Sequence, residues 1–340
     1  MALQGRLLER LLEAGFSEEL VQASLPAWWT AAEQNSSSAQ TLVALLLARR
    51  LSLDPESLLD DNVPIGFLHA GPTKFKHLRL EEGPRLKALT AYAQGVARIT
   101  FAVHRRTATE AIPSALELRQ HILDSGRDNV GFGDVLTLCW SLDIPVLHLR
   151  LFPAKTKGVT ATSVRIGARQ AILVARESGV AAQYMFHVAH ELGHISLGHL
   201  ANAATIVDVD INDSDAVSKS PGSDDEEEAA DAFAQELLTG DKNFQVSRAL
   251  PESTRSGAGT PRELATRAIQ AGSALKVDPG HIVMCYGETT GEWALAQAAA
   301  KLIPDQDDKP GNLVNKVFWS QLGSISDPQS GAFLSAVAAV

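Results

Sequence analysis

The sequence predicts a predominantly helical α+β protein that contains a short β-sheet. Apolar residues recur at helical spacing through the first ninety-odd residues and in several segments between residues 115 and 277. PVLHLRL, residues 145–151, alternates in the manner of a strand, and SVRIGARQAILVA, residues 163–175, has the pattern of a hairpin that bends near Gly167. Helices therefore dominate the predicted fold, and the few strands lie near the middle of the chain.

The composition is typical of a soluble globular protein. The chain has 340 residues, of which 45% are hydrophobic and 21% are charged. Its net charge of −10 argues against direct binding of nucleic acid. The two cysteines, Cys139 and Cys285, are far apart, which fits a reducing compartment and argues against a thiolate zinc site. We see no signal peptide and no apolar run long enough to cross a bilayer, so we expect a cytoplasmic protein without membrane association.

Residues 1–95 form the predicted N-terminal helical module. Its first helix carries an apolar stripe made of Leu7, Leu8, Leu11 and Leu12. Residues 41–59 have the pattern of a helix, a break at Asp54–Pro55 and a second helix. Such a helix pair could bind DNA, but no basic stripe accompanies it, so we favour an interaction module.

An acidic, serine-rich connector covers residues 208–225. Asp208, Asp210 and Asn212 have the spacing that opens a calcium loop. Asp213 stands where that loop needs glycine, and Lys219 stands where it needs the closing glutamate, so we reject calcium binding here.

The stretch FHVAHELGHISLGH, residues 186–199, contains four histidines and one glutamate, and its centre is an H-E-x-x-H motif that begins at His190. Residues four apart on a helix differ by about 40° in direction, so His190 and His194 can bind one Zn²⁺. Glu191 is turned by about 100°, where it can reach a water on the metal and act as a general base.

The other residues of this helix receive secondary roles. If the helix is continuous, His199 lies about 180° from His190 and cannot share the metal. His187 lies on the metal side one turn back and is a cleft or outer-shell candidate. Gly193 lies on the metal-facing half, where a side chain would obstruct a substrate or the metal. The residue that stabilises an oxyanion is left open among Tyr184, Tyr286 and His281.

A catalytic zinc also needs a third protein ligand. The acidic cluster Glu226, Glu227 and Glu228 precedes a helix with an apolar stripe formed by Ala230, Phe233, Ala234, Leu237 and Leu238. Glu228 points away from that stripe, whereas Glu226 and Glu227 flank it about equally. Helical geometry therefore leaves two candidates.

These motifs resemble the ImmA/IrrE family of zinc metallopeptidases over roughly residues 115–303. The resemblance rests on FHVAHELGHISLGH and on EEEAADAFAQELL, which is similar to the family's E-x-x-A-x-x-F-A-x-x-L-L signature. It implies that Glu227 is the third ligand. Asp231, one turn further on, could accept the outer N–H of a ligand histidine and fix its tautomer.

The resemblance also implies the architecture and the activity. We expect a small thermolysin-like metallopeptidase core over residues 96–304, with a short β-sheet beside the active-site helix, and a tail or subdomain over residues 305–340. Family members are implied to cleave or inactivate helix-turn-helix repressors that control stress-response or mobile-element genes. The predicted hairpin could present its edge to an extended substrate segment.

Two functions follow from these expectations. The first is a zinc-dependent endopeptidase that cleaves a specific protein, such as a helix-turn-helix transcriptional repressor; Mn²⁺ or Fe²⁺ could replace Zn²⁺. The alternative is a non-proteolytic regulatory binding protein that retains a metal-stabilised peptidase fold. Glu191 favours the enzyme, because a structural metal site does not need a general base.

Overall fold

The computed structural model describes residues 5–68, 73–75, 84–104, 111–153, 159–175, 177–201, 204–209, 223–250, 259–304 and 309–340. This part of the chain is predominantly helical and contains a small mixed sheet, which confirms the coarse fold prediction. Most of the predicted connector, residues 210–222, lies outside the described residues.

The elements follow one another along the chain in the following order: α1 (Arg6–Glu13), α2 (Glu18–Ala23), η1 (Glu33–Asn35), α3 (Ser37–Leu51), α4 (Pro55–Leu59), β1 (Thr73–Phe75), α5 (Pro84–Val103), α6 (Ala115–Asp124), α7 (Phe132–Ser141), β2 (Val146–His148), β3 (Val159–Ile166), β4 (Arg169–Val174), α8 (Ala181–Ser196), β5 (Thr205–Val209), α9 (Ser223–Thr239), η2 (Phe244–Ala249), α11 (Pro261–Leu275), α12 (Pro279–Thr290), α13 (Trp293–Ala300), α14 (Pro310–Leu322) and α15 (Pro328–Val337).

The five described strands form one sheet in the order β1-β5-β3-β4-β2. The predicted hairpin is present as β3 and β4, which pair antiparallel around Gly167, whose φ of +62° suits a residue without a side chain. β5 pairs antiparallel with β3, and β2 pairs parallel with β4. The hairpin is therefore in the interior of the sheet. The expectation that it offers a free edge to substrate was wrong, because β5 and β2 already occupy its two sides.

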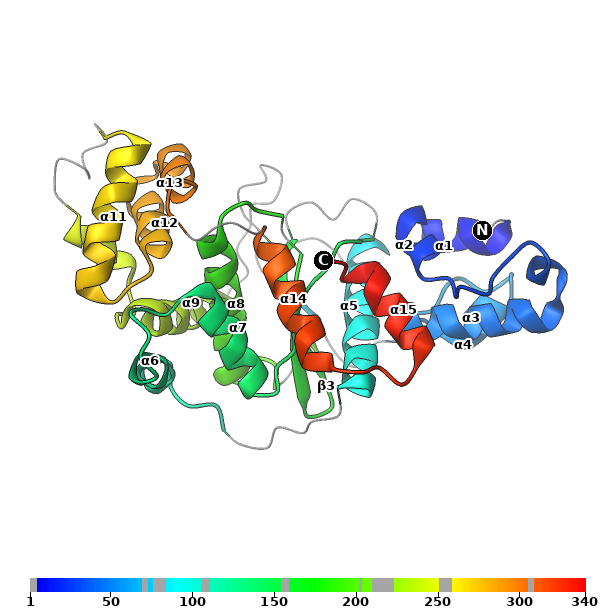
Figure 1. Ribbon diagram of the computed structural model, residues 1–340. Helices are drawn as coiled ribbons and strands as arrows, with labels where there is room; N and C mark the ends of the chain where they lie inside the picture. The colour runs from blue at the N-terminus through cyan, green and yellow to red at the C-terminus, as the bar shows by residue number, and fades with distance from the viewer. Residues whose placement is uncertain are drawn as a thin grey trace.

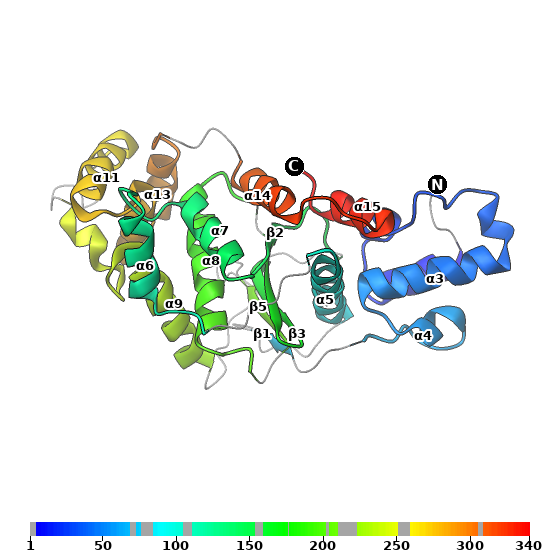
Figure 2. The ribbon, with the colours of Figure 1, turned by 60° about the horizontal axis from the view of Figure 1, so that its bottom comes forward.

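The sheet lies between two layers of helices. α8 packs on β3 and β4 from one side, with α7 beside it, and α5 covers the other side (Figure 2). Residues alternate between the two faces: on β4, Ile172 joins the core under α8, whereas Leu173 joins the core under α5. This arrangement places α8, which carries the H-E-x-x-H motif, directly against the sheet.

The described residues form three apolar cores along the molecule. The first joins α1–α5 to one face of the sheet and to α14 and α15. The second lies between the opposite face of the sheet and α6–α9, and the third joins α11, α12 and α13. Figure 1 shows α11–α13 at one end of the molecule and α1–α4 at the other, so the second core is in the middle.

The N-terminal helices are joined to the rest of the molecule through α5 and the C-terminal helices. The boundary that the sequence suggested near residue 95 falls inside α5, which continues from Pro84 to Val103. α15 packs on α2 and α5, and the guanidinium of Arg50 donates to the carbonyl oxygens of Ser24 and Gln329. Residues 310–337 therefore return to the N-terminal half of the molecule instead of forming a separate tail.

Within the described ranges, no helix is both long enough and apolar enough to cross a membrane.

Candidate metal centre

α8 carries the H-E-x-x-H motif in a buried position. It packs on the sheet and against α7, α9 and α12, so its motif residues are enclosed from several directions. Glu191 and His194 are fully buried, and His190 is 5% exposed. Buried ionisable groups need partners, because transfer of a charge out of water is strongly unfavourable.

α9 approaches α8 closely at Gly193. A Cβ atom added to Gly193 would lie 3.1 Å from the carbonyl oxygen of Ala230 and 3.2 Å from the Cβ of Phe233. Gly193 thus faces the backbone of α9, where its missing side chain lets the two helices meet. The expectation that it keeps space open for a substrate is replaced by this packing role.

The close approach brings one carboxylate of α9 to the two histidines. Glu227 is buried, whereas Glu226 is half-buried and Glu228 is exposed, so exposure resolves the choice that helical geometry left open. The Nε2 atoms of His190 and His194 lie 3.3 Å and 3.4 Å from the Glu227 carboxylate oxygens, and 2.9 Å from each other. Tetrahedral Zn²⁺ with ligand bonds of about 2.0–2.1 Å separates its ligand atoms by roughly 3.3 Å, close to these values.

Both histidines use their other ring nitrogen outside the cluster. His190 Nδ1 lies 2.8 Å from an Asp231 carboxylate oxygen, as the sequence predicted for Asp231. His194 Nδ1 lies 2.7 Å from His199 Nδ1. If the Nδ1 atoms of His190 and His194 carry the hydrogens, their Nε2 lone pairs and the Glu227 carboxylate point at one another. This arrangement suits a bound cation. The donor set therefore fits a divalent metal ion held by His190, His194 and Glu227.

His199 does not lie where a continuous helix would put it. α8 ends at Ser196, and Gly198, with a φ of +75°, reverses the chain direction. The assumption of a continuous helix up to His199 was wrong, because Gly198 adopts the left-handed conformation that ends helices. The reversal returns the His199 side chain to His194.

Glu191 lies beside the metal cluster without belonging to it. The ligand atoms that converge in the described chain are those of His190, His194 and Glu227. The Glu191 carboxylate instead accepts a hydrogen bond from the hydroxyl of Ser163 on β3. Sequence reasoning missed Ser163, because β3 also contains Thr160 and Thr162 and nothing in the sequence distinguishes one of these three hydroxyl residues from the others.

Electrostatics keep the Glu227 carboxylate ionised. Burial raises the pKa of Glu227, but when His190 and His194 are protonated in the metal-free protein, hydrogen bonds and charge interactions with them outweigh burial and lower that pKa well below its ordinary value. A carboxylate that stays negative is suited to bind a cation.

The other sequence candidates lie elsewhere. The hydroxyl of Tyr184 is 3.2 Å from His148 Nε2 in the core, and that of Tyr286 donates to Glu292. His281 is buried, with its Nε2 atom 3.2 Å from Gln235 Oε1. His187 is partly buried and contacts the ring of Phe186. Neither the two tyrosines nor His281 supplies one of the converging ligand atoms.

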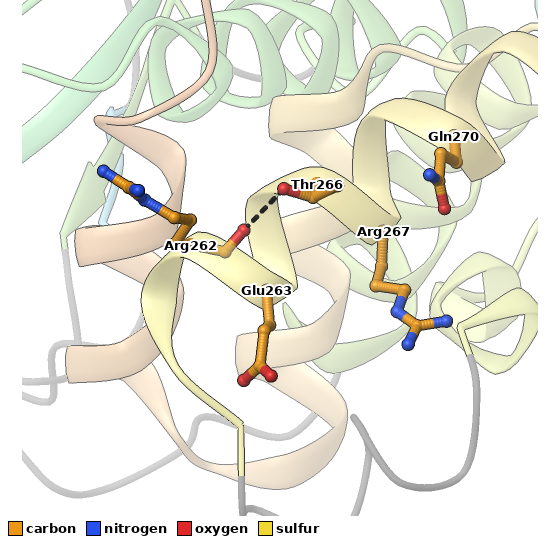
Figure 3. Close-up of a pocket in the computed structure, with 5 residues that line it drawn as sticks. All are labelled: Arg262, Glu263, Thr266, Arg267 and Gln270. Carbon is orange, nitrogen blue, oxygen red and sulfur yellow. Dashed lines mark hydrogen bonds between the residues drawn. The ribbon is translucent and has the colours of Figure 1, made fainter.

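A separate surface hollow of about 480 Å³ lies along α11. Its lining consists of five polar or charged residues of this one helix: Arg262, Glu263, Thr266, Arg267 and Gln270. Figure 3 shows the side chains of Arg262 and Arg267 pointing away from each other. None of them belongs to the metal cluster, so the hollow adds nothing to its chemistry.

Comparison with protein-family models, with curated proteins and with solved structures found no match for this chain.

Proposed function

We propose that this protein is a metal-dependent endopeptidase that uses Zn²⁺, with Mn²⁺ or Fe²⁺ as possible substitutes. The observation that carries the proposal is the buried convergence of His190, His194 and Glu227 beside Glu191. Three protein ligands on a tetrahedral ion leave one position for water, which is the arrangement of catalytic zinc sites.

The side chains have distinct roles in this proposal. His190, His194 and Glu227 would hold the ion, which when bound supplies a Lewis acid that lowers the pKa of water. Glu191 accepts a proton from water and later passes it to the leaving amine. Ser163 orients the Glu191 carboxylate, and Asp231 orients the His190 ring.

The separation of Glu191 from the ligand cluster favours an enzyme over a binding protein. A purely structural site gains nothing from an additional buried carboxylate next to the metal, since such a group is unfavourable to bury. In a hydrolase the same carboxylate is the general base.

The substrate we propose is a specific cytoplasmic protein, such as a helix-turn-helix repressor in a stress-response or mobile-element switch. This part of the proposal, like a thermolysin-like core, comes from the resemblance of the two motifs to the ImmA/IrrE family. The N-terminal helices would then supply contacts to that protein.

Metal analysis and Glu191→Gln test the proposal together. Elemental analysis of the purified protein should give about one zinc per chain. Glu191→Gln should keep this metal and lower cleavage of co-expressed repressors by at least about 100-fold, the scale of general-base catalysis. Glu228→Gln is the matched control, because Glu228 is exposed on α9 and should leave both readouts unchanged.

Two outcomes would reject the enzyme. A purified protein without bound metal that also fails to take up added Zn²⁺ removes the site. A Glu191→Gln variant that keeps full biological activity favours the alternative, in which a metal-stabilised protein acts by binding.

A further inference from the structure

We propose that His199 is the outer partner of His194, which fixes the tautomer and direction of that ligand and thereby sets metal affinity. The inference rests on the proposed metal centre and adds a residue to it. Its evidence is a double connection, through backbone and side chain, between His194 and His199.

The backbone connection is a Schellman motif at the end of α8. The His199 N–H donates to the His194 carbonyl at 3.0 Å, and the Gly198 N–H donates to the Ile195 carbonyl at 3.2 Å. This pair of hydrogen bonds requires a left-handed residue between them, and Gly198 provides it with a φ of +75°. The motif fixes His199 relative to the residue whose side chain it contacts.

The side-chain connection determines where the hydrogens lie. The two Nδ1 atoms are 2.7 Å apart, so one nitrogen donates and the other accepts. His194 Nε2 faces the cluster, 2.9 Å from His190 Nε2, and needs its lone pair for the metal. His194 therefore carries its hydrogen on Nδ1 and donates, and His199 Nδ1 accepts.

The two ligand histidines thus have different supports. His190 donates to a carboxylate, Asp231, whereas His194 donates to a neutral imidazole, which is a weaker acceptor. Outer partners of this kind typically change metal affinity 10- to 100-fold when they are removed. His199 should belong to this group although it does not touch the metal.

The test compares Zn²⁺ affinity and folding of the metal-free protein in three variants of the full chain. His199→Ala removes the acceptor and should raise the Zn²⁺ Kd, measured by competition with a chromophoric chelator, about 10- to 100-fold. His199→Asn should restore most of the affinity, because its Oδ1 atom can occupy the position of Nδ1 and accept the same hydrogen. His121→Ala is the control, since His121 is an exposed histidine on α6 and supplies none of the converging ligand atoms.

A purely structural role for His199 would change the thermal midpoint of the metal-free protein and leave the Kd of the folded fraction unchanged. Equal Kd values for His199→Ala and the parent overturn the inference, as does an Asn variant as weak as the Ala variant. A parent that binds no Zn²⁺ refutes the proposed function itself, so the two failures are distinguishable.

Discussion

Ser163 contacts the carboxylate that we propose as the general base. It is fully buried on β3, on the face of the sheet that contacts α8, and its hydroxyl donates to Glu191. The neighbouring Thr162 faces the other side of the strand. The hydrogen bond favours one direction of the Glu191 carboxylate.

We therefore expect Ser163→Ala to lower kcat about 10-fold, because the general base loses its orientation, with no change in Zn²⁺ affinity. Steady-state cleavage of a repressor substrate and chelator competition measure the two quantities. Thr162→Ala should leave kcat within about twofold of the parent. A Ser163→Ala enzyme with unchanged kcat would show that packing alone orients Glu191.

For single residues, the sequence predicts positions that depend only on the geometry of one helix. The spacing of His190 and His194 defines a shared helix face whatever the rest of the fold does. The choice between Glu226 and Glu227 required exposure, which depends on how α9 docks. His199 was misplaced because the helix was assumed to continue, although the Gly198-His199 pair is a typical helix end.

At the scale of elements, α9 connects two neighbouring helices through polar side chains. Glu227 reaches the histidines of α8, and two turns later Gln235 reaches His281 on α12. His281 is almost completely buried, and burial, together with the charge of Arg119, lowers its pKa to about 4. The α9–α12 contact therefore holds a neutral imidazole.

This contact should be sensitive to acid. The folded-state pKa of His281 lies below its ordinary value of 6.5, so the unfolded chain binds more protons below that pH. The contribution of His281 to stability is therefore complete above pH 6.5 and is lost as the pH falls towards 4. The loss amounts to up to about 3 kcal/mol. Denaturant unfolding of the metal-free protein at several pH values should show a shallower acid loss in His281→Gln than in the parent. Parallel curves for the two proteins would contradict the assignment.

Predictability differs between elements for physical reasons. The break between α3 and α4 follows from local chemistry, because Asp54 caps α4 and Pro55 occupies its first turn. The hairpin follows from alternation and Gly167. The order of the strands in the sheet does not follow from the sequence. β1 and β5 are far apart in the chain, and strands of only three and five residues carry no pattern that indicates which strand each one pairs with.

At the scale of the whole molecule, the C-terminal helices complete the N-terminal core. Phe318 of α14 and Phe333 of α15 are buried in the same cluster as α1–α5. The ring of Phe333 also lies under the guanidinium of Arg50, 5.3 Å from its centroid. The weak apolar pattern of residues 305–340 did not reveal this association.

Truncation of this ring should therefore destabilise the N-terminal helices. We expect Phe333→Ala to lower the free energy of unfolding by about 3–5 kcal/mol, as for other buried aromatic residues, as measured by denaturant titration of tryptophan fluorescence. Leu116→Ala, at an exposed position of α6, should change it by less than about 0.5 kcal/mol. A change below about 1 kcal/mol for Phe333→Ala would mean that α15 is not part of the core.

The return of α14 and α15 also has a consequence during synthesis. The ribosome releases α1–α5 more than two hundred residues before α14 and α15, which cover them. In the nascent chain, α1–α5 therefore keep part of their apolar surface exposed until α14 and α15 emerge. Folding of α1–α5 thus depends on contacts between distant parts of the polypeptide, and such contacts slow folding. Chaperone engagement should therefore concentrate on ribosome-bound chains that have not yet emerged beyond residue 310.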